Sequence, residues 1–124
     1  MERIHSDDAP KAIGPYSQAM KAGNLIFTSG QVSLDPATGE IVPGDFNAQA
    51  RRAFDNLRAV LTAAGTDFSH VIKATVYLTD LANFQALNTM YAEVFGDHKP
   101  ARTTVQVSAL PKGAALEIDL IAIV

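Results

Sequence analysis

Residues 116–123, near the end of the chain, read Leu-Glu-Ile-Asp-Leu-Ile-Ala-Ile, and this stretch decides the fold. Its side chains alternate at the two-residue period of a β-strand. One face is formed by Leu116, Ile118 and Leu120. The opposite face carries Glu117, Ile121 and Ile123. Because the strand is apolar on both faces near its end, its sheet needs a covering layer on each side.

The rest of the chain supplies two helices and several further strands. Apolar residues recur at helical spacing over residues 46–64, between a capping Asp45 and a terminating Gly65. A second apolar stripe covers residues 84–95, and Asp80 can cap this helix. Strands are expected at residues 16–21, 25–33, 71–79, 102–108 and 116–123, and the turn-rich loop 34–44 has room for one more short strand.

Two amphipathic helices can cover only one face of such a sheet. In the strand at 71–79, the side chains expected on one face are Ile72, Ala74, Val76 and Leu78. No helix is left for the second face, so we expect another copy of the chain to cover it. The sequence therefore predicts one α+β domain over residues 1–124 that assembles as an oligomer.

Composition narrows the classes of function. The chain has 124 residues, of which 48% are hydrophobic and 19% charged, and no apolar run approaches the roughly 20 residues that span a bilayer. Its N-terminus resembles neither a secretory signal nor a transit peptide, so a cytoplasmic location is expected. The absence of cysteine excludes disulfides and thiolate nucleophiles. A net charge of -3 argues against a surface built for nucleic acid.

Three polar residues depart from the structural pattern. Arg102 opens a strand, Glu117 lies on the face assigned to a subunit contact, and Asn88 interrupts the apolar stripe of the second helix. Taken singly, each has a structural explanation: an ion pair between Arg102 and Glu117, and a buried amide bonded to the backbone. Together, in regions expected to meet at an oligomer interface, they indicate a ligand site.

Other chemistries find no support in the residues. The histidines at 5, 70 and 98 lack a second ligand at metal spacing, so no metal site is expected. Ser29 is not part of a nucleophile elbow, since the motif lacks its leading glycine. The glycines match neither a phosphate-binding loop nor a dinucleotide fingerprint. No cofactor is expected.

Four blocks of sequence resemble the RidA (reactive intermediate deaminase A, or YjgF) family, and the resemblance covers essentially the whole chain. The blocks are Gly14-Pro15-Tyr16-Ser17-Gln18, Thr28-Ser29-Gly30-Gln31, Pro100-Ala101-Arg102-Thr103 and Leu116-Glu117-Ile118-Asp119. The resemblance implies a chorismate-mutase-like fold with a mixed sheet of about six strands and two helices on one face. It also implies a homotrimer with sites between subunits.

The resemblance further implies an activity and its residues. Family deaminases hydrolyse 2-iminobutanoate and 2-iminopropanoate to 2-oxo acids and ammonia. Arg102 matches the carboxylate-binding arginine and Glu117 the catalytic glutamate. The pocket positions are matched by Tyr16, Ser29, Gly30 and Asn88, with Phe84 as an apolar wall and Thr104 where many members carry cysteine.

The residues fit a mechanism of this kind. Arg102 can grip the substrate carboxylate with two parallel N–H bonds, and Glu117 can take a proton from the attacking water. Ser29 and the Gly30 backbone can hold the carboxylate or the amino group. Two alternatives remain: a module that binds 2-oxo acids without turnover, and an endoribonuclease or translation inhibitor, which the acidic charge disfavours.

Overall fold

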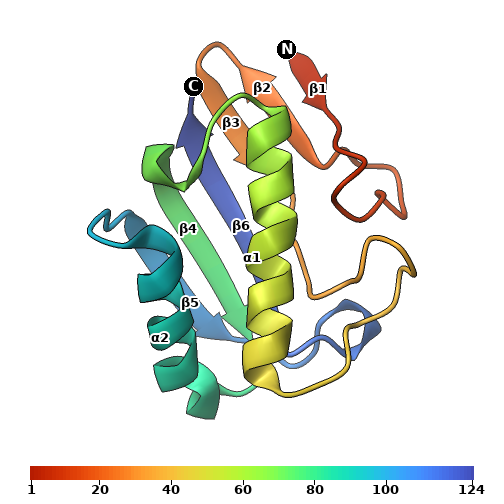
Figure 1. Cartoon of the computed structure of the whole chain (residues 1–124), viewed down its shortest axis with the longest axis vertical. Coiled ribbons are helices and arrows are strands. Elements are labelled where there is room, and N and C mark those ends of the chain that lie inside the picture. Colours follow the sequence, from red (N-terminus) through yellow and green to blue (C-terminus); the bar gives the residue numbers. More distant parts are fainter.

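The computed structural model describes all 124 residues as one sheet with two helices packed on one face (Figure 1). The strands are β1 (Glu2–Ile4), β2 (Ala19–Ala22), β3 (Leu25–Thr28), β4 (Val71–Leu78), β5 (Ala101–Gln106) and β6 (Leu116–Ile123). The helices are α1 (Phe46–Ala63) and α2 (Phe84–Phe95), with short 3₁₀ turns η1 (Phe68–His70), η2 (Leu81–Asn83) and η3 (Pro111–Gly113). The expected α+β class, with six strands and both helices on one face, is confirmed.

The strand order is β1-β2-β3-β6-β4-β5, which makes β6 a central strand and β5 an edge strand. Every neighbouring pair is antiparallel except β4 and β5, which run parallel because α2 carries the chain from one to the other. The sheet is therefore mixed, as expected. The edge position of β5 leaves one side of its backbone without a strand partner in the chain.

The N-terminal half of the sheet differs from the prediction in its strand boundaries. The first expected strand, 16–21, is reduced to β2, and the second, 25–33, ends at Thr28. The sixth strand is β1 at the N-terminus, which sequence analysis missed because three residues are too short to show a period. The loop 34–44 contributes only an isolated bridge between Leu34 and Ile41.

The core lies between the sheet and the helices. Leu116, Ile118 and Leu120 of β6 are almost fully buried against α1, as predicted for that face. Ile72 was wrongly placed on the buried face of β4, because a bulge between Val71 and Lys73 shifts the register and leaves Ile72 45% exposed.

The caps explain where the helices begin. Asp45 caps α1, accepting a hydrogen bond from the Ala48 N–H at 3.0 Å. Asp80 caps the η2 turn rather than α2 itself, which corrects the expectation for that residue. Gly65 follows α1 with a positive φ of 83°, so the helix ends where the sequence predicted.

No element of the chain covers the second face of the sheet. Phe27 on β3 is 43% exposed there, and Ile121 and Ile123 on β6 are half-buried. This face has the mixed apolar and polar character expected of a surface that another chain would cover. None of the helices combines the length and the apolarity that crossing a membrane requires.

Candidate functional site

Arg102 lies on the helix-facing side of the sheet. In the parallel register of β4 and β5, Arg102 is paired with Ala74, whose side chain is buried beneath the helices. The guanidinium carbon lies 4.7 Å from the ring centroid of Tyr91 and 5.5 Å from that of Phe84, both on α2. No hydrogen bond or ion pair within the chain uses the guanidinium. Its five N–H donors are therefore free to bind an anion.

Two more of the expected site residues lie on this side. Asn88 is half-buried and falls between Phe84 and Tyr91 at spacings of four and three residues, which puts the three on one stripe of α2. Thr104 follows Arg102 by two residues and so points to the same side of β5. The hydroxyl oxygens of Thr104 and Tyr91 are buried and have no hydrogen-bond partner in the chain. We call Arg102, Phe84, Asn88, Tyr91 and Thr104 the arginine half-site.

Burial sets the protonation of Tyr91. Desolvation raises the pKa of its phenol, and the positive charge of Arg102 opposes that shift only in part. The hydroxyl therefore stays protonated and remains a hydrogen-bond donor at neutral pH.

Glu117 lies on the opposite, open face. It is paired with Tyr77 in the antiparallel register of β4 and β6, and neither side chain points toward the helices. Its carboxyl group lies directly over Gly30: a Cβ built on Gly30 would stand 2.6 Å from the Glu117 Cδ. The glycine therefore leaves the space that the carboxyl group occupies.

A cavity of about 180 Å³ opens beside this carboxyl group. It is lined by Pro10, Lys11, Ile13, Tyr16, Gln18, Gly30, Gln31, Val32, Leu34, Pro111, Lys112 and Glu117. We call Tyr16, Ser29, Gly30 and Glu117, with this cavity, the glutamate half-site. The backbone bonds between Gln31 and Ile118, at 2.8 and 3.1 Å, hold the 29–31 segment against β6 and so fix Gly30 beside Glu117.

The carboxyl groups of the open face hold protons more tightly than usual. Desolvation, and then the charge of Asp119, raises the pKa of Glu117. Desolvation also raises the pKa of Asp119, although the Tyr77 hydroxyl and the Lys73 ammonium pull it down. A carboxyl group with a raised pKa is a better proton acceptor once it is ionised.

The hydrogen bonds of Ser29 restrict what its hydroxyl can do. It donates its hydrogen to the Ser17 carbonyl at 2.6 Å, and its backbone N–H donates to the Gln18 carbonyl at 2.9 Å. The hydroxyl oxygen can therefore accept a hydrogen bond from an amino group but has no hydrogen left for a carboxylate. The Gly30 N–H has no acceptor in the chain, so it is the free donor at this point.

The structure thus separates the eight expected site residues into two groups of four. Arg102 and Glu117 lie on opposite faces of the same sheet and form no ion pair within the chain. The explanation that Arg102 and Glu117 form an ion pair within one chain is therefore wrong. Each charge is left without a counter-ion from its own chain.

Three charged or aromatic residues of these half-sites escaped sequence analysis. Lys11 and Lys112 line the Glu117 cavity, and Tyr91 contacts the arginine. Pro111 and Gly113 flank Lys112 and mark a turn, which was the signal available in the sequence; in the structure Lys112 takes a positive φ of 57° there. Tyr91 gave none, because an aromatic residue on an apolar stripe is typical of a core.

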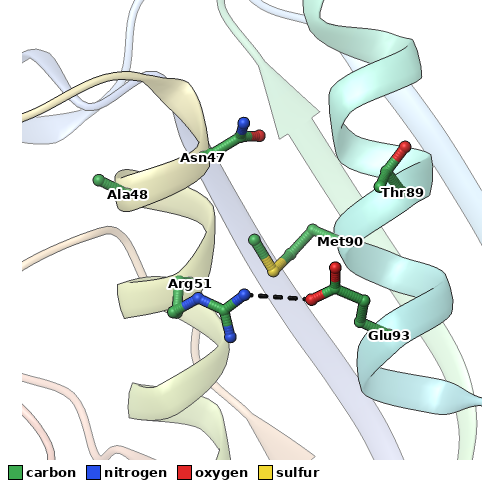
Figure 2. Close-up of a pocket in the computed structure, with 6 residues that line it drawn as sticks. All are labelled: Asn47, Ala48, Arg51, Thr89, Met90 and Glu93. Carbon is green, nitrogen blue, oxygen red and sulfur yellow. Dashed lines mark hydrogen bonds and ion pairs between the residues drawn. The ribbon is translucent and has the colours of Figure 1, made fainter.

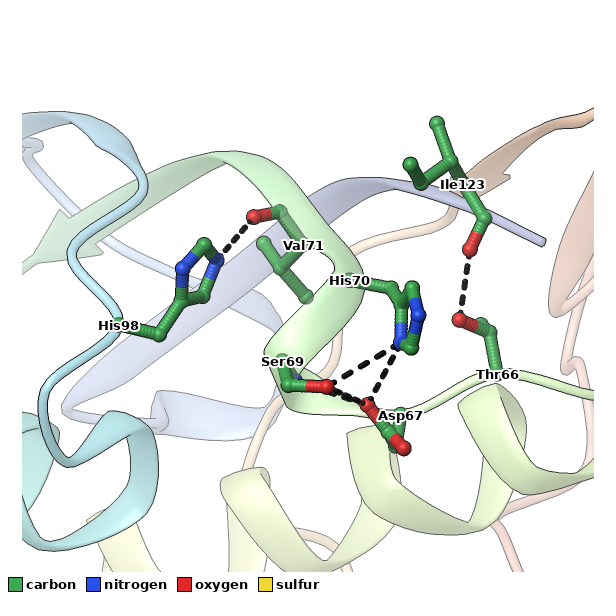
Figure 3. Close-up of polar contacts among 7 residues, drawn as sticks. All are labelled: Thr66, Asp67, Ser69, His70, Val71, His98 and Ile123. Atoms are coloured by element: carbon green, nitrogen blue, oxygen red, sulfur yellow. Dashed lines mark hydrogen bonds and ion pairs between the residues drawn. The ribbon is translucent and has the colours of Figure 1, made fainter.

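The serine and histidine side chains are engaged in structural bonds (Figure 3). The Asp67 carboxylate accepts hydrogen bonds from the Ser69 hydroxyl and from His70 Nδ1, at 2.9 Å for the latter. Those bonds, the serine hydroxyl first, lower the pKa of Asp67 to about 2. The serine gives its hydrogen to the carboxylate rather than to the histidine, which is not the order that activates a nucleophile. His98 bonds the Val71 carbonyl at 2.6 Å.

A larger cavity, of about 250 Å³, lies between α1 and α2 (Figure 2). Its two charged groups pair with each other: Arg51 Nη2 lies 3.1 Å from Glu93 Oε2, and both side chains are more than half exposed. Met90 forms its floor (Figure 2). With its two charges already paired in solvent, this groove offers no unpaired charge to a ligand. No cluster of histidine, aspartate and glutamate suited to a metal ion is present in the chain.

The fold is that of an α+β protein with two half-sites on opposite faces of its sheet, and comparison with known proteins gives its family. E. coli TdcF, in a crystal structure with bound serine, superposes with a TM-score of 0.95 at 43% identity over 100% of this chain and 99% of the TdcF chain. Protein DfrA of Myxococcus xanthus is 59% identical over 97% of this chain and 93% of its own length. The 2-iminobutanoate/2-iminopropanoate deaminase of Capra hircus is 48% identical over 97% of this chain and 88% of its own.

A family model described as Endoribonuclease L-PSP matches residues 6–124. The chain belongs to this family, which is the RidA/YjgF family.

Proposed function

We propose that the protein is a cofactor-independent deaminase that hydrolyses 2-iminobutanoate and 2-iminopropanoate to 2-oxo acids and ammonia. One observation carries the proposal. Arg102 is held against two aromatic rings while all its N–H donors remain free. A planar guanidinium with free donors matches a carboxylate in a bidentate geometry, which fixes the orientation as well as the position of the substrate. The relatives named as deaminases support this choice of substrate.

Glu117 supplies the base in this proposal. Its ionised carboxylate takes a proton from water, whose oxygen forms a bond to the imine carbon while the C=N π pair moves to nitrogen. The same carboxyl then returns this proton to nitrogen, which gives a carbinolamine. Glu117 next takes the hydroxyl proton of the carbinolamine and passes it to nitrogen as the carbonyl forms, the C–N bond breaks and ammonia leaves. The Ser29 oxygen can accept from the departing amino group, and the free Gly30 N–H can donate to an anionic oxygen.

The proposed site takes its two halves from different chains. Arg102 and Glu117 face away from each other across one sheet, so both can reach one substrate only if the arginine half-site of one copy faces the glutamate half-site of another. The uncovered face of the sheet and the free edge of β5 are the surfaces that such an assembly would use. A closed trimer forms three equivalent sites of this kind.

Ammonia release from freshly generated 2-aminoacrylate tests the activity, and mixed oligomers test the architecture. Arg102→Ala and Glu117→Gln should each be inactive alone. When the two inactive variants are denatured and refolded together in equal amounts, about a quarter of wild-type activity should return, because one site in four then combines the intact arginine of one chain with the intact glutamate of the other. No recovery from well-assembled mixtures would mean that one chain supplies both residues.

A second candidate, a binding protein for small carboxylates, is favoured by one observation. The arginine half-site is complete within a single chain, so it can hold a carboxylate without Glu117. Tight binding of 2-oxobutanoate with no ammonia release would favour this function. An endoribonuclease is the weaker alternative, because the histidines are engaged in separate local bonds and the net charge is -3.

A further inference from the structure

Arg102 occupies an edge strand, and its guanidinium forms no ion pair within the chain. An arginine side chain loses much rotamer freedom when it is ordered, so a single orientation requires compensating contacts. The guanidinium of Arg102 lies over two aromatic rings of α2. These rings therefore set the position of the Arg102 guanidinium.

The two rings differ in how firmly they are held. Phe84 opens α2 and is 39% exposed, and its ring lies at the longer distance of 5.5 Å. Tyr91 is half-buried, lies at 4.7 Å, and packs against Phe95 with ring centroids 4.4 Å apart and against Phe54 at 6.1 Å. Tyr91 is thus the ring through which the guanidinium is connected to the core.

We infer that Tyr91 is a positioning residue: its ring holds the Arg102 guanidinium ready for a substrate carboxylate. The inference rests on the function proposed above. Cation–π attraction is strongest where the pair is partly removed from water, as it is here, and an ordered guanidinium loses less entropy when the carboxylate binds. The ring acts through Arg102, so its removal should weaken binding more than it slows the chemical step.

Two variants can separate the role of the Tyr91 ring from that of its hydroxyl group. The hydroxyl oxygen is buried and has no partner in the chain. Removing a buried group that makes no hydrogen bond costs nothing and can stabilise the fold. Tyr91→Phe should therefore keep the function, whereas Tyr91→Leu, which removes the ring, should lose it.

The chain also offers a matched control in the same aromatic cluster. Phe68 stacks edge-on with Phe54, as Tyr91 does, and carries another arginine over its face, with Arg58 Cζ 4.9 Å from the ring centroid. Phe68→Leu therefore removes an aromatic ring and a cation–π contact from the same core, away from Arg102.

The experiment measures KM, kcat and the dissociation constant of 2-oxobutanoate for Tyr91→Leu, Tyr91→Phe and Phe68→Leu. Tyr91→Leu should raise KM and the dissociation constant about three- to thirtyfold and leave kcat within about twofold. Tyr91→Phe and Phe68→Leu should leave both within about twofold of wild type. Unchanged 2-oxobutanoate binding in Tyr91→Leu, or an equal loss in Phe68→Leu, overturns the inference. If Tyr91→Leu does not fold, Tyr91→Met replaces it.

An NMR measurement does not depend on the proposed function. The Arg102 side-chain Nε–H resonance, assigned by its loss in Arg102→Lys, should be displaced by the ring current of Tyr91. It should move toward the position of a free arginine in Tyr91→Leu and stay in Tyr91→Phe. A wild-type protein that neither binds 2-oxobutanoate nor releases ammonia would refute the proposed function, whereas an unmoved resonance in Tyr91→Leu would refute the role of Tyr91.

Discussion

The arginine half-site and the glutamate half-site place their charged groups in opposite kinds of surroundings. On the helix-facing side, a cation is placed on aromatic rings and its donors are left free. On the open face, an anion is placed over a glycine, partly desolvated and next to a second carboxylate, so that its pKa is raised. The first arrangement favours binding a carboxylate, and the second favours transfer of a proton.

The separation of the two halves has a physical consequence for the single chain. Each half-site carries an unpaired charge that its own chain does not neutralise, and partly buried unpaired charges destabilise a fold. Such charges persist where function requires them. The chain is thus less stable than it could be, and the comparison between the two halves can be tested by removing one charge at a time.

Removing the guanidinium should have the largest effect. Arg102→Ala should lower kcat/KM for imine hydrolysis by a factor on the order of 100 or more, because the substrate loses its orienting contact. The variant should remain folded and assembled, since Arg102 makes no polar contact within its chain. Coupled assays with a serine dehydratase measure the loss. Normal turnover would rule out the role assigned to Arg102.

Filling the space over Gly30 tests the other half. A methyl group at this position would stand 2.6 Å from the Glu117 carboxyl, so Gly30→Ala must displace it, and kcat should fall on the order of tenfold or more. Gly14→Ala is the control, because its Cβ would meet the Tyr16 ring at an ordinary 3.5 Å. A crystal structure of Gly30→Ala should show a moved carboxylate. Full activity with an undisplaced carboxyl group would contradict the role assigned to Gly30.

The pH dependence of stability should separate Glu117 from ordinary carboxylates. Since its pKa is raised in the folded state, the folded chain binds this proton more tightly than the unfolded chain does. The bound proton stabilises the folded chain at acidic pH. This stabilisation is lost as the pH rises from the ordinary pKa of a glutamate to the raised pKa of Glu117. Glu117→Gln should therefore raise the Tm relative to wild type more at pH 7 than at pH 4.

Glu93→Gln, on an exposed surface pair, reports the general effect of removing one negative charge. The opposite trend for Glu117→Gln would mean that a cation from another chain pairs with Glu117 in the assembled protein. That outcome would sharpen the comparison, because no residue of the same chain forms an ion pair with Glu117.

The smallest effect is expected outside both half-sites. Arg51→Ala removes the exposed ion pair with Glu93 between the helices (Figure 2) and should change the free energy of unfolding by about 0.5 kcal/mol or less. Turnover should not change. Urea unfolding measures the change in stability, and the ammonia assay measures turnover. A loss of activity comparable to that of Arg102→Ala would contradict the prediction that Arg51 lies outside the site.

Much of the fold follows from patterns within single segments. The alternation in residues 116–123 fixed the two faces of β6, and the spacing of residues 46–64 fixed α1. Features that arise between segments were missed. The bulge that exposes Ile72 depends on how β4 pairs with β6, and β1 becomes a strand only because β2 pairs with it.

The candidate site divides in the same way. The sequence by itself determined which residues stand out chemically, because Arg102, Asn88 and Glu117 each break a local apolar or strand pattern. It also determined, through the alternation of β6, that Glu117 shares a face with Ile121 and Ile123.

Only the tertiary structure decided that Arg102 and Glu117 face away from each other. Alternation tells which residues of one strand share a side, but it cannot relate the side of one strand to that of another. That relation is set by the register of β5 on β4 and of β4 on β6 and by the face on which the helices pack. The same packing brought Tyr91 to the guanidinium, since helix and strand contact each other only after the chain has folded.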